Sequence, residues 1–141
     1  MSDTILEKRL RMLEVTYASA LISFGVFTIS AGSLQLDIFR YLFMVLGLVV
    51  MATPVLGLHR RIVKFVAART GPSYITLGLF ALPAGLVVPP LVLAFFLRLG
   101  VQSGITTPQE NLLPFIGAAV MILINLGVLI YNVVESRRKI A

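Results

Sequence analysis

The sequence predicts an all-α integral membrane protein, a four-helix bundle with both termini in the cytoplasm and an N-terminal amphipathic interfacial helix. Three observations lead to this fold class. Of the 141 residues, 58% are hydrophobic and 13% are charged, whereas soluble domains average about 45–50% apolar and about 25% charged residues. Long uncharged runs separate the charged residues, and lysines and arginines gather in alternate connections between those runs. The length leaves room for one domain, residues 1–141.

Four uncharged runs delimit the expected membrane spans. A bilayer core about 30 Å thick needs roughly 20 apolar residues in a helix. A chain in lipid must satisfy its own backbone hydrogen bonds, so such runs have to be helical. The sequence therefore predicts spans at approximately residues 15–36, 41–58, 73–97 and 111–134.

Residues 4–14 precede the first span and have a helical pattern. Thr4 and Glu7 stand at the spacing of a capping box. Leu6, Leu10 and Leu13 share one helical face, and the basic residues lie on others. We expect an amphipathic helix that lies at the cytoplasmic interface and runs into the first span; the alternative is a frayed, solvated N-terminus.

Short connections follow the first and third spans. Only residues 37–40 separate the first two apolar runs, which predicts an antiparallel hairpin with Asp37 near the start of its second helix. Thr107, Pro108 and Glu110 form a favourable helix start, with a capping threonine and a proline at the first position. The fourth span should begin there and bend around Pro114.

Residues 59–73 are basic and partly amphipathic and end at Gly71-Pro72. Such clusters beside a membrane contact anionic headgroups. The basic residues concerned are Arg60, Arg61, Lys64 and Arg69. An acidic cytosolic partner or a nucleic acid is the alternative ligand, but neither interleaved aromatic residues nor a nucleic-acid motif accompanies them, so we expect no nucleic-acid partner.

Orientation follows from the lysine and arginine distribution. With four spans, ten of the twelve basic residues fall on the side of the termini, and only Arg40 and Arg98 fall on the opposite side. The positive-inside rule then places both termini in the cytoplasm. We expect the host membrane to be the plasma (inner) membrane.

Small polar residues form a series on the first span and another on the fourth. Steps of three, four and seven residues are the pattern of left-handed helix packing. The first series is Thr16, Ser19, Ser23, Ser30 and Ser33, with Val26 filling one position, and the second is Ala118, Asn125 and Asn132. These two seams pack against each other, or against another copy or subunit. The alternative is a polar path for a proton or small solute.

The third span contains three prolines, Pro83, Pro89 and Pro90. Each lacks the amide that would bond the carbonyl four residues earlier, so the carbonyls of Leu79, Gly85 and Leu86 lose their helical partners. Such positions usually kink a helix, and neighbouring groups bond the freed carbonyls. In some transporters, however, broken helices expose carbonyls to an ion.

Chemistry-bearing residues are few. The chain has no cysteine and one histidine, and no charged residue lies within the four expected spans. An intramembrane ionisable group usually marks proton or ion coupling, and Glu14, just before the first span, is the nearest candidate. We expect no metal, no cofactor and no enzymatic activity, because no nucleophile–base pair or ligand cluster can be assembled.

Residues 114–137, together with the number of spans, are similar to the last helix and the four-helix layout of small multidrug-resistance transporters. The resemblance covers about a sixth of the chain. It implies transport coupled to a glutamate well inside the first helix, whereas Glu14 precedes the apolar run here.

Two functions remain open from the sequence. The first is a non-catalytic subunit or scaffold of a membrane assembly, associating with other membrane subunits or with itself through the seams on the first and fourth spans. The alternative is a small transporter or channel with a proline-broken third helix.

Overall fold

A computed structural model of the chain describes residues 3–34, 37–69 and 72–138. These residues form six helices: α1 (Asp3–Gly32), α2 (Asp37–Val55), α3 (Leu58–Arg69), α4 (Pro72–Leu86), α5 (Val88–Gln102) and α6 (Pro108–Arg137). Four stretches are long and apolar enough to cross a membrane, namely Ile5–Gly32, Asp37–Val55, Tyr74–Gln102 and Pro108–Arg137. The all-helical class and the number of candidate spans predicted from sequence are therefore confirmed.

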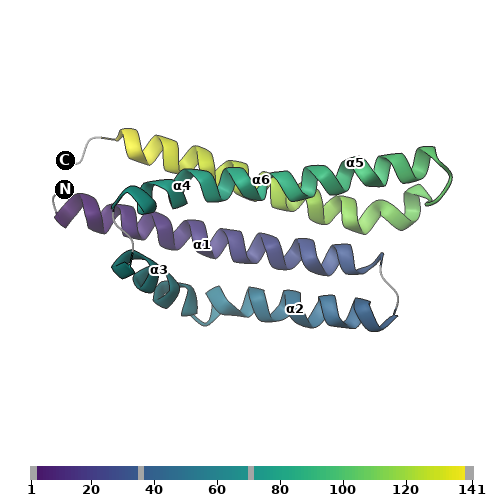
Figure 1. Cartoon of the computed structure of the whole chain (residues 1–141), viewed down its shortest axis with the longest axis horizontal. Helices are drawn as coiled ribbons and strands as arrows, with labels where there is room; N and C mark the ends of the chain where they lie inside the picture. Colours follow the sequence, from purple (N-terminus) through teal and green to yellow (C-terminus); the bar gives the residue numbers. More distant parts are fainter. Residues whose placement is uncertain (1–2, 35–36, 70–71, 139–141) are drawn as a thin grey trace.

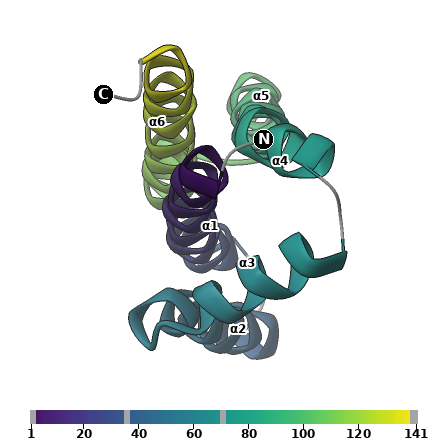
Figure 2. The same ribbon diagram turned by 90° about the vertical axis from the view of Figure 1, so that its left-hand side faces the viewer.

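The helices are arranged around α1. Figure 1 shows α1, α2, the α4–α5 pair and α6 running along the long axis, with both termini at the same end. Figure 2 places α1 in the middle, with α2 on one side and α4, α5 and α6 on the other. Helix α2 packs mainly on α1 and touches α3 to a smaller extent. The face of α2 that points away from α1 is therefore largely uncovered by the other described helices.

The N-terminal residues are helical and run into the first span, as predicted, whereas their place at a membrane interface stays a prediction. Among the described residues they form the first turns of one continuous helix, α1. Met12 and Leu13 are buried in an apolar cluster with Val63 of α3 and two residues of α4, Ile75 and Leu79. Tertiary packing against α3 and α4 therefore covers part of the face that the sequence pattern assigned to the membrane interface. The Thr4 side chain, half of the expected capping box, lies outside the described side chains.

The helix ends lie several residues from the predicted span boundaries. Helices α1 and α6 include charged residues at their ends, because long basic side chains can extend from an apolar helix toward water. The second span was predicted to continue to Leu58, but α2 ends at Val55. Gly57 there adopts a φ of +76°, a conformation suited to glycine that stops a helix. Leu58 instead begins α3, a helix that the sequence analysis treated as a basic connection.

The predicted start of the fourth span is confirmed. Thr107 has extended dihedral angles, and its side chain accepts a hydrogen bond from the Glu110 amide at 3.2 Å. Pro108 is the first residue of α6, where its missing amide would have no helical partner. Pro114 lies inside α6 and is buried.

Two glycines allow α1 and α2 to approach closely. A Cβ atom added to Gly47 would lie 2.8 Å from the carbonyl oxygen of Gly25, and one added to Gly25 would lie 2.8 Å from that of Gly47. A Cβ at Gly47 would also lie 2.5 Å from Cγ1 of Ile29. Small residues that admit such backbone contact are the usual means of helix association in lipid.

We therefore predict that Gly47→Ala separates α1 from α2. Overpacking a tight contact costs about 1–3 kcal/mol of unfolding free energy. Denaturation in mixed detergent micelles, followed by circular dichroism, measures this loss. Gly127→Ala is the matched control, because a Cβ at Gly127 would meet no atom within 4 Å, and it should leave stability unchanged or raise it by up to about 1 kcal/mol. Equal stability of the two variants would contradict the close contact.

Candidate functional site

The polar positions of α1 and α6 face each other in a regular antiparallel register. Thr16 lies opposite Asn132, and Ser23 lies opposite Asn125. Each step of seven residues forward on α1 therefore matches seven residues backward on α6. The same register pairs Ser30 with Ala118, and a Cβ at the neighbouring Gly117 would clash with the Ser30 hydroxyl. We call these paired positions the polar seam.

The Ser23 and Asn125 side chains form hydrogen bonds with each other and with backbone carbonyls of their own helices. The Asn125 amide nitrogen donates to the Ser23 hydroxyl at 3.0 Å and to the Met121 carbonyl at 2.8 Å. The Ser23 hydroxyl in turn donates to the Ala20 carbonyl at 3.0 Å. Ser23 is 0% and Asn125 is 1% exposed, so water does not reach the pair.

The Thr16–Asn132 pair repeats this arrangement and adds α4. The Asn132 amide nitrogen donates to the Thr16 hydroxyl and to the Leu79 carbonyl, each at 2.8 Å. The Thr16 hydroxyl donates to the Met12 carbonyl at 2.8 Å. Leu79 is the residue whose helical partner would be Pro83, which has no amide to donate. Asn132 thus supplies the donor that the proline removes and joins α1, α4 and α6.

The seam expected from sequence does not continue evenly along α1. Thr16, Ser23 and Ser30 are buried, whereas Ser19 and Ser33 are only half-buried. The Ser33 hydroxyl donates to the Ser30 carbonyl of its own helix at 2.7 Å. The three buried residues face α6 within the same chain, so the polar seam is not available to an outside partner.

The proline-containing span is interrupted at one residue. Val87 separates α4 from α5 and keeps right-handed helical angles, with φ −76° and ψ −26°. The Val87 amide bonds the Ala84 carbonyl at 3.4 Å, and the Leu91 amide bonds the Val87 carbonyl at 3.4 Å. Pro83 and Pro90 are buried, whereas Pro89 is exposed. The chain therefore continues in nearly the same direction through the prolines (Figure 1).

The basic residues between the second and third spans lie on α3. Val63 is buried on one face of this helix, and Arg60, Arg61, Lys64 and Arg69 are exposed. The Arg69 guanidinium lies 4.4 Å from the centre of the Phe65 ring. Helix α3 lies at the same end of the molecule as both termini (Figure 1), which brings these residues to the side that carries the other basic groups.

An ion cluster that sequence analysis missed joins the two ends of the chain. Lys8 Nζ donates to the Glu135 carbonyl at 2.7 Å and lies 3.8 Å from Glu135 Oε2. Arg138 Nη1 donates to Glu135 Oε1 at 2.9 Å, and this hydrogen bond raises the pKa of the Arg138 guanidinium. The cluster depends on the proximity of α1 and α6. A pattern of neighbouring residues in the sequence cannot predict that proximity.

The double role of Asn132 leads to a prediction. Asn132→Val leaves the Leu79 carbonyl without a donor, and we expect the free energy of unfolding to fall by about 1–2 kcal/mol. Pro83→Ala restores an amide four residues after Leu79, so the same substitution should cost less in a Pro83→Ala background. Unfolding of all four proteins in mixed micelles measures this coupling.

Asn125→Val serves as the matched control for that cycle. Its backbone acceptor, the Met121 carbonyl, lies in an uninterrupted part of α6, so its cost should be the same with Pro83 as with Ala at that position. An Asn132→Val cost that does not depend on residue 83 would show that the Leu79 contact is unimportant.

Comparisons with protein-family models, curated proteins and solved structures find no match to this chain. The described residues form a helical bundle with four stretches that are long and apolar enough to cross a membrane, which is compatible with an integral membrane protein.

Proposed function

We propose that this protein is a non-catalytic subunit or scaffold of a membrane protein assembly. The supporting observation is that the polar seam is closed. Asn125 and Asn132 are at most 1% exposed, and their amide nitrogens donate hydrogen bonds to groups within the chain. Polar groups that hold helices together in this way serve packing, whereas a solute pathway would need polar groups that face a water-filled space.

Charge supports a particular placement of the assembly. Helix α3, the start of α1 and the end of α6 lie at one end of the bundle (Figure 1), and most basic residues belong to these segments. Arg40 is in the first turn of α2 and Arg98 is near the end of α5, and these helix ends lie at the other end of the bundle. We place the basic end in the cytoplasm of a plasma (inner) membrane, following the positive-inside rule. Helix α3 then contacts anionic headgroups through Arg60, Arg61 and Lys64.

The partner surface that we propose is the outer face of α2. The polar seam cannot serve, because its buried residues contact each other. Helix α2 packs mainly on α1, and its other face carries large exposed apolar residues such as Tyr41, Val45 and Val49. Another membrane subunit, or a second copy of this chain, would bury this face through van der Waals contacts.

Cysteine cross-linking tests the subunit hypothesis cleanly because the chain has no native cysteine. We predict that Val45→Cys, with a bifunctional thiol- and photoreactive probe, links the protein in intact membranes to one defined companion chain. Leu123→Cys on α6, also exposed, is the control and should give little product. Mass spectrometry identifies the linked chain.

Two results would contradict the proposal. One is a protein that stays uncross-linked from both positions and runs as a monomer without companions in mild detergent. The other is equal cross-linking from α2 and α6, which would indicate random collisions in the membrane.

A small transporter or channel is the second candidate, and one observation favours it. Asn132 Oδ1 is buried beside the Leu79 carbonyl and accepts no hydrogen bond within the described part of the chain. An acceptor in that position could receive a donor from a solute if the helices separated. Flux in reconstituted vesicles that is lost in Asn132→Leu would favour this candidate over the scaffold.

A further inference from the structure

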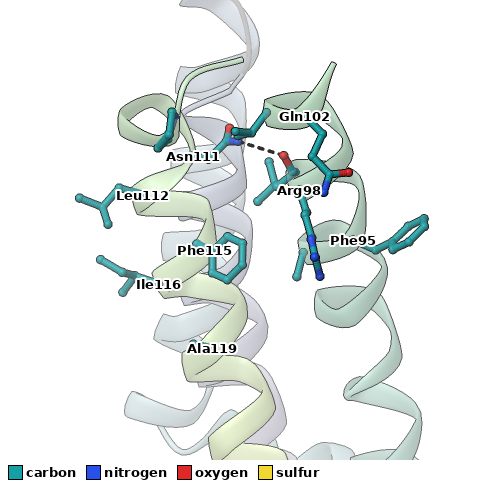
Figure 3. A pocket seen from close by; sticks show the side chains of 12 residues that line it. Phe95, Arg98, Gln102, Asn111, Leu112, Phe115, Ile116 and Ala119 are labelled. Carbon is teal, nitrogen blue, oxygen red and sulfur yellow. Dashed lines mark hydrogen bonds between the residues drawn. The ribbon is translucent and has the colours of Figure 1, made fainter. Parts of the chain in front are cut away.

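A groove separates α5 from α6 at the end of the bundle opposite the termini. Its volume is about 650 Å³, within the range of small-molecule sites. Its lining includes Phe115, Ile116 and Ala119 of α6 and Phe95 and Arg98 of α5. Figure 3 shows Phe115 and Arg98 between the two helices, with Phe95 and Ile116 at the outer edges. The walls are almost entirely apolar, and Arg98 is the one charged residue among those that line the groove.

Arg98 forms no ion pair with the residues that the structure describes. Among the described residues, the carboxylate that forms ion pairs is Glu135, at the far end of the bundle, and its partners are Lys8 and Arg138. Glu110, in the first turn of α6, does not line the groove. The Arg98 guanidinium lies between α5 and α6, level with the Phe115 ring (Figure 3). Arg98 is exposed, and a guanidinium without a carboxylate partner is available to an anionic ligand.

The ends of two helices also border the groove. Pro108, the first residue of α6, lines the groove, and the N-terminal end of a helix carries a partial positive charge. The C-terminal end of α5, at Gln102, carries the opposite partial charge and also borders the groove. The charge preference of the groove therefore depends on Arg98.

Asn111 holds the groove open in a fixed shape. Its side-chain nitrogen donates to the Leu97 carbonyl of α5 at 3.2 Å and to the Thr106 hydroxyl of the connection at 3.1 Å. Asn111 is buried, so its hydrogen bonds connect the end of α5 directly to the start of α6. The groove is thus present before any ligand binds, which lowers the cost of binding.

The groove has charged and polar residues toward one end and apolar residues toward the other, as a lipid has a polar headgroup and apolar acyl chains. Arg98 and Gln102 lie in the last two turns of α5, and four residues of helix correspond to about 6 Å. If the bundle spans a bilayer, the end of α5 is near the headgroups of the adjoining leaflet, and the long Arg98 side chain can extend toward them. Phe115 lies level with the guanidinium, and Ala119 continues the apolar wall toward the bilayer centre.

We propose that this groove binds one anionic phospholipid of the adjoining leaflet. Its phosphate contacts the Arg98 guanidinium and the Gln102 amide, and one acyl chain lies along Phe115 and Ala119. The site is separate from the basic surface of α3 and lies in the opposite leaflet. It does not depend on the subunit function proposed above.

Tryptophan fluorescence can test this site because the chain contains no native tryptophan. Phe115→Trp places a reporter in the groove, and the protein is reconstituted into vesicles that mix dibrominated phosphatidylglycerol or dibrominated phosphatidylcholine with unbrominated lipid. We expect the anionic lipid to quench with about five-fold higher relative affinity, corresponding to about 1 kcal/mol for one arginine.

Arg98→Gln in the reporter background should abolish this preference, so that the two brominated lipids quench to about the same extent. Arg40→Gln is the matched control, since it removes the other basic residue of the same end and should leave the preference intact. Phe96→Trp, exposed on α5 but outside the groove lining, reports the preference of ordinary surface lipid and should be lower. Ile116→Trp replaces the reporter if Phe115→Trp does not fold.

Three outcomes would overturn the proposal. The two lipids could quench the groove reporter equally, or the preference could survive Arg98→Gln. The reporter could also be shielded from both brominated lipids, which would mean that a helix of a partner or of a second copy occupies the groove.

Discussion

The antiparallel contact between α1 and α6 is the interaction on which the rest of the structure depends. Without water between the helices, a buried hydroxyl or amide needs a partner inside the protein. Thr16 and Ser23 meet this need by donating to their own helix and accepting from the asparagine opposite. Because both pairs follow the same seven-residue spacing, they fix the register of the two helices, and the third position accommodates the close approach of Gly117 to Ser30.

This register places the other helices. Asn132 reaches the Leu79 carbonyl of α4, so the defect that Pro83 introduces becomes a specific contact between spans. On its opposite side, α1 packs closely against α2 at Gly25 and Gly47. Helix α1 is therefore enclosed by neighbours, while α2 and the α5–α6 groove remain open to the surroundings. These two open surfaces are where we place a protein partner and a lipid.

Local patterns in the sequence predicted the helices that cross the bundle, the Thr107 cap and the seven-residue spacing of both seams, because these features depend on nearby residues or on helical periodicity. The sequence also identified the Leu79 carbonyl as a group without a backbone donor. It could not name Asn132 as the new donor, because that requires knowing that α4 lies beside α6. The Lys8–Glu135 pair and the Arg98 groove were missed for the same reason, since each joins segments that are distant in sequence or separated by a turn. The boundary between α2 and α3 was misplaced because apolar composition alone does not register the turn at Gly57.

Disulfide formation between paired cysteines in native membranes tests the central contact most directly. The account predicts that Ser23→Cys combined with Asn125→Cys forms a disulfide under mild oxidation, because these side chains touch across the seam. Ser23→Cys combined with Ala118→Cys is displaced by one heptad, about 10 Å along the helix, and should not cross-link. Cross-linking of the displaced pair, or of neither pair, would contradict the register from which the remaining contacts follow.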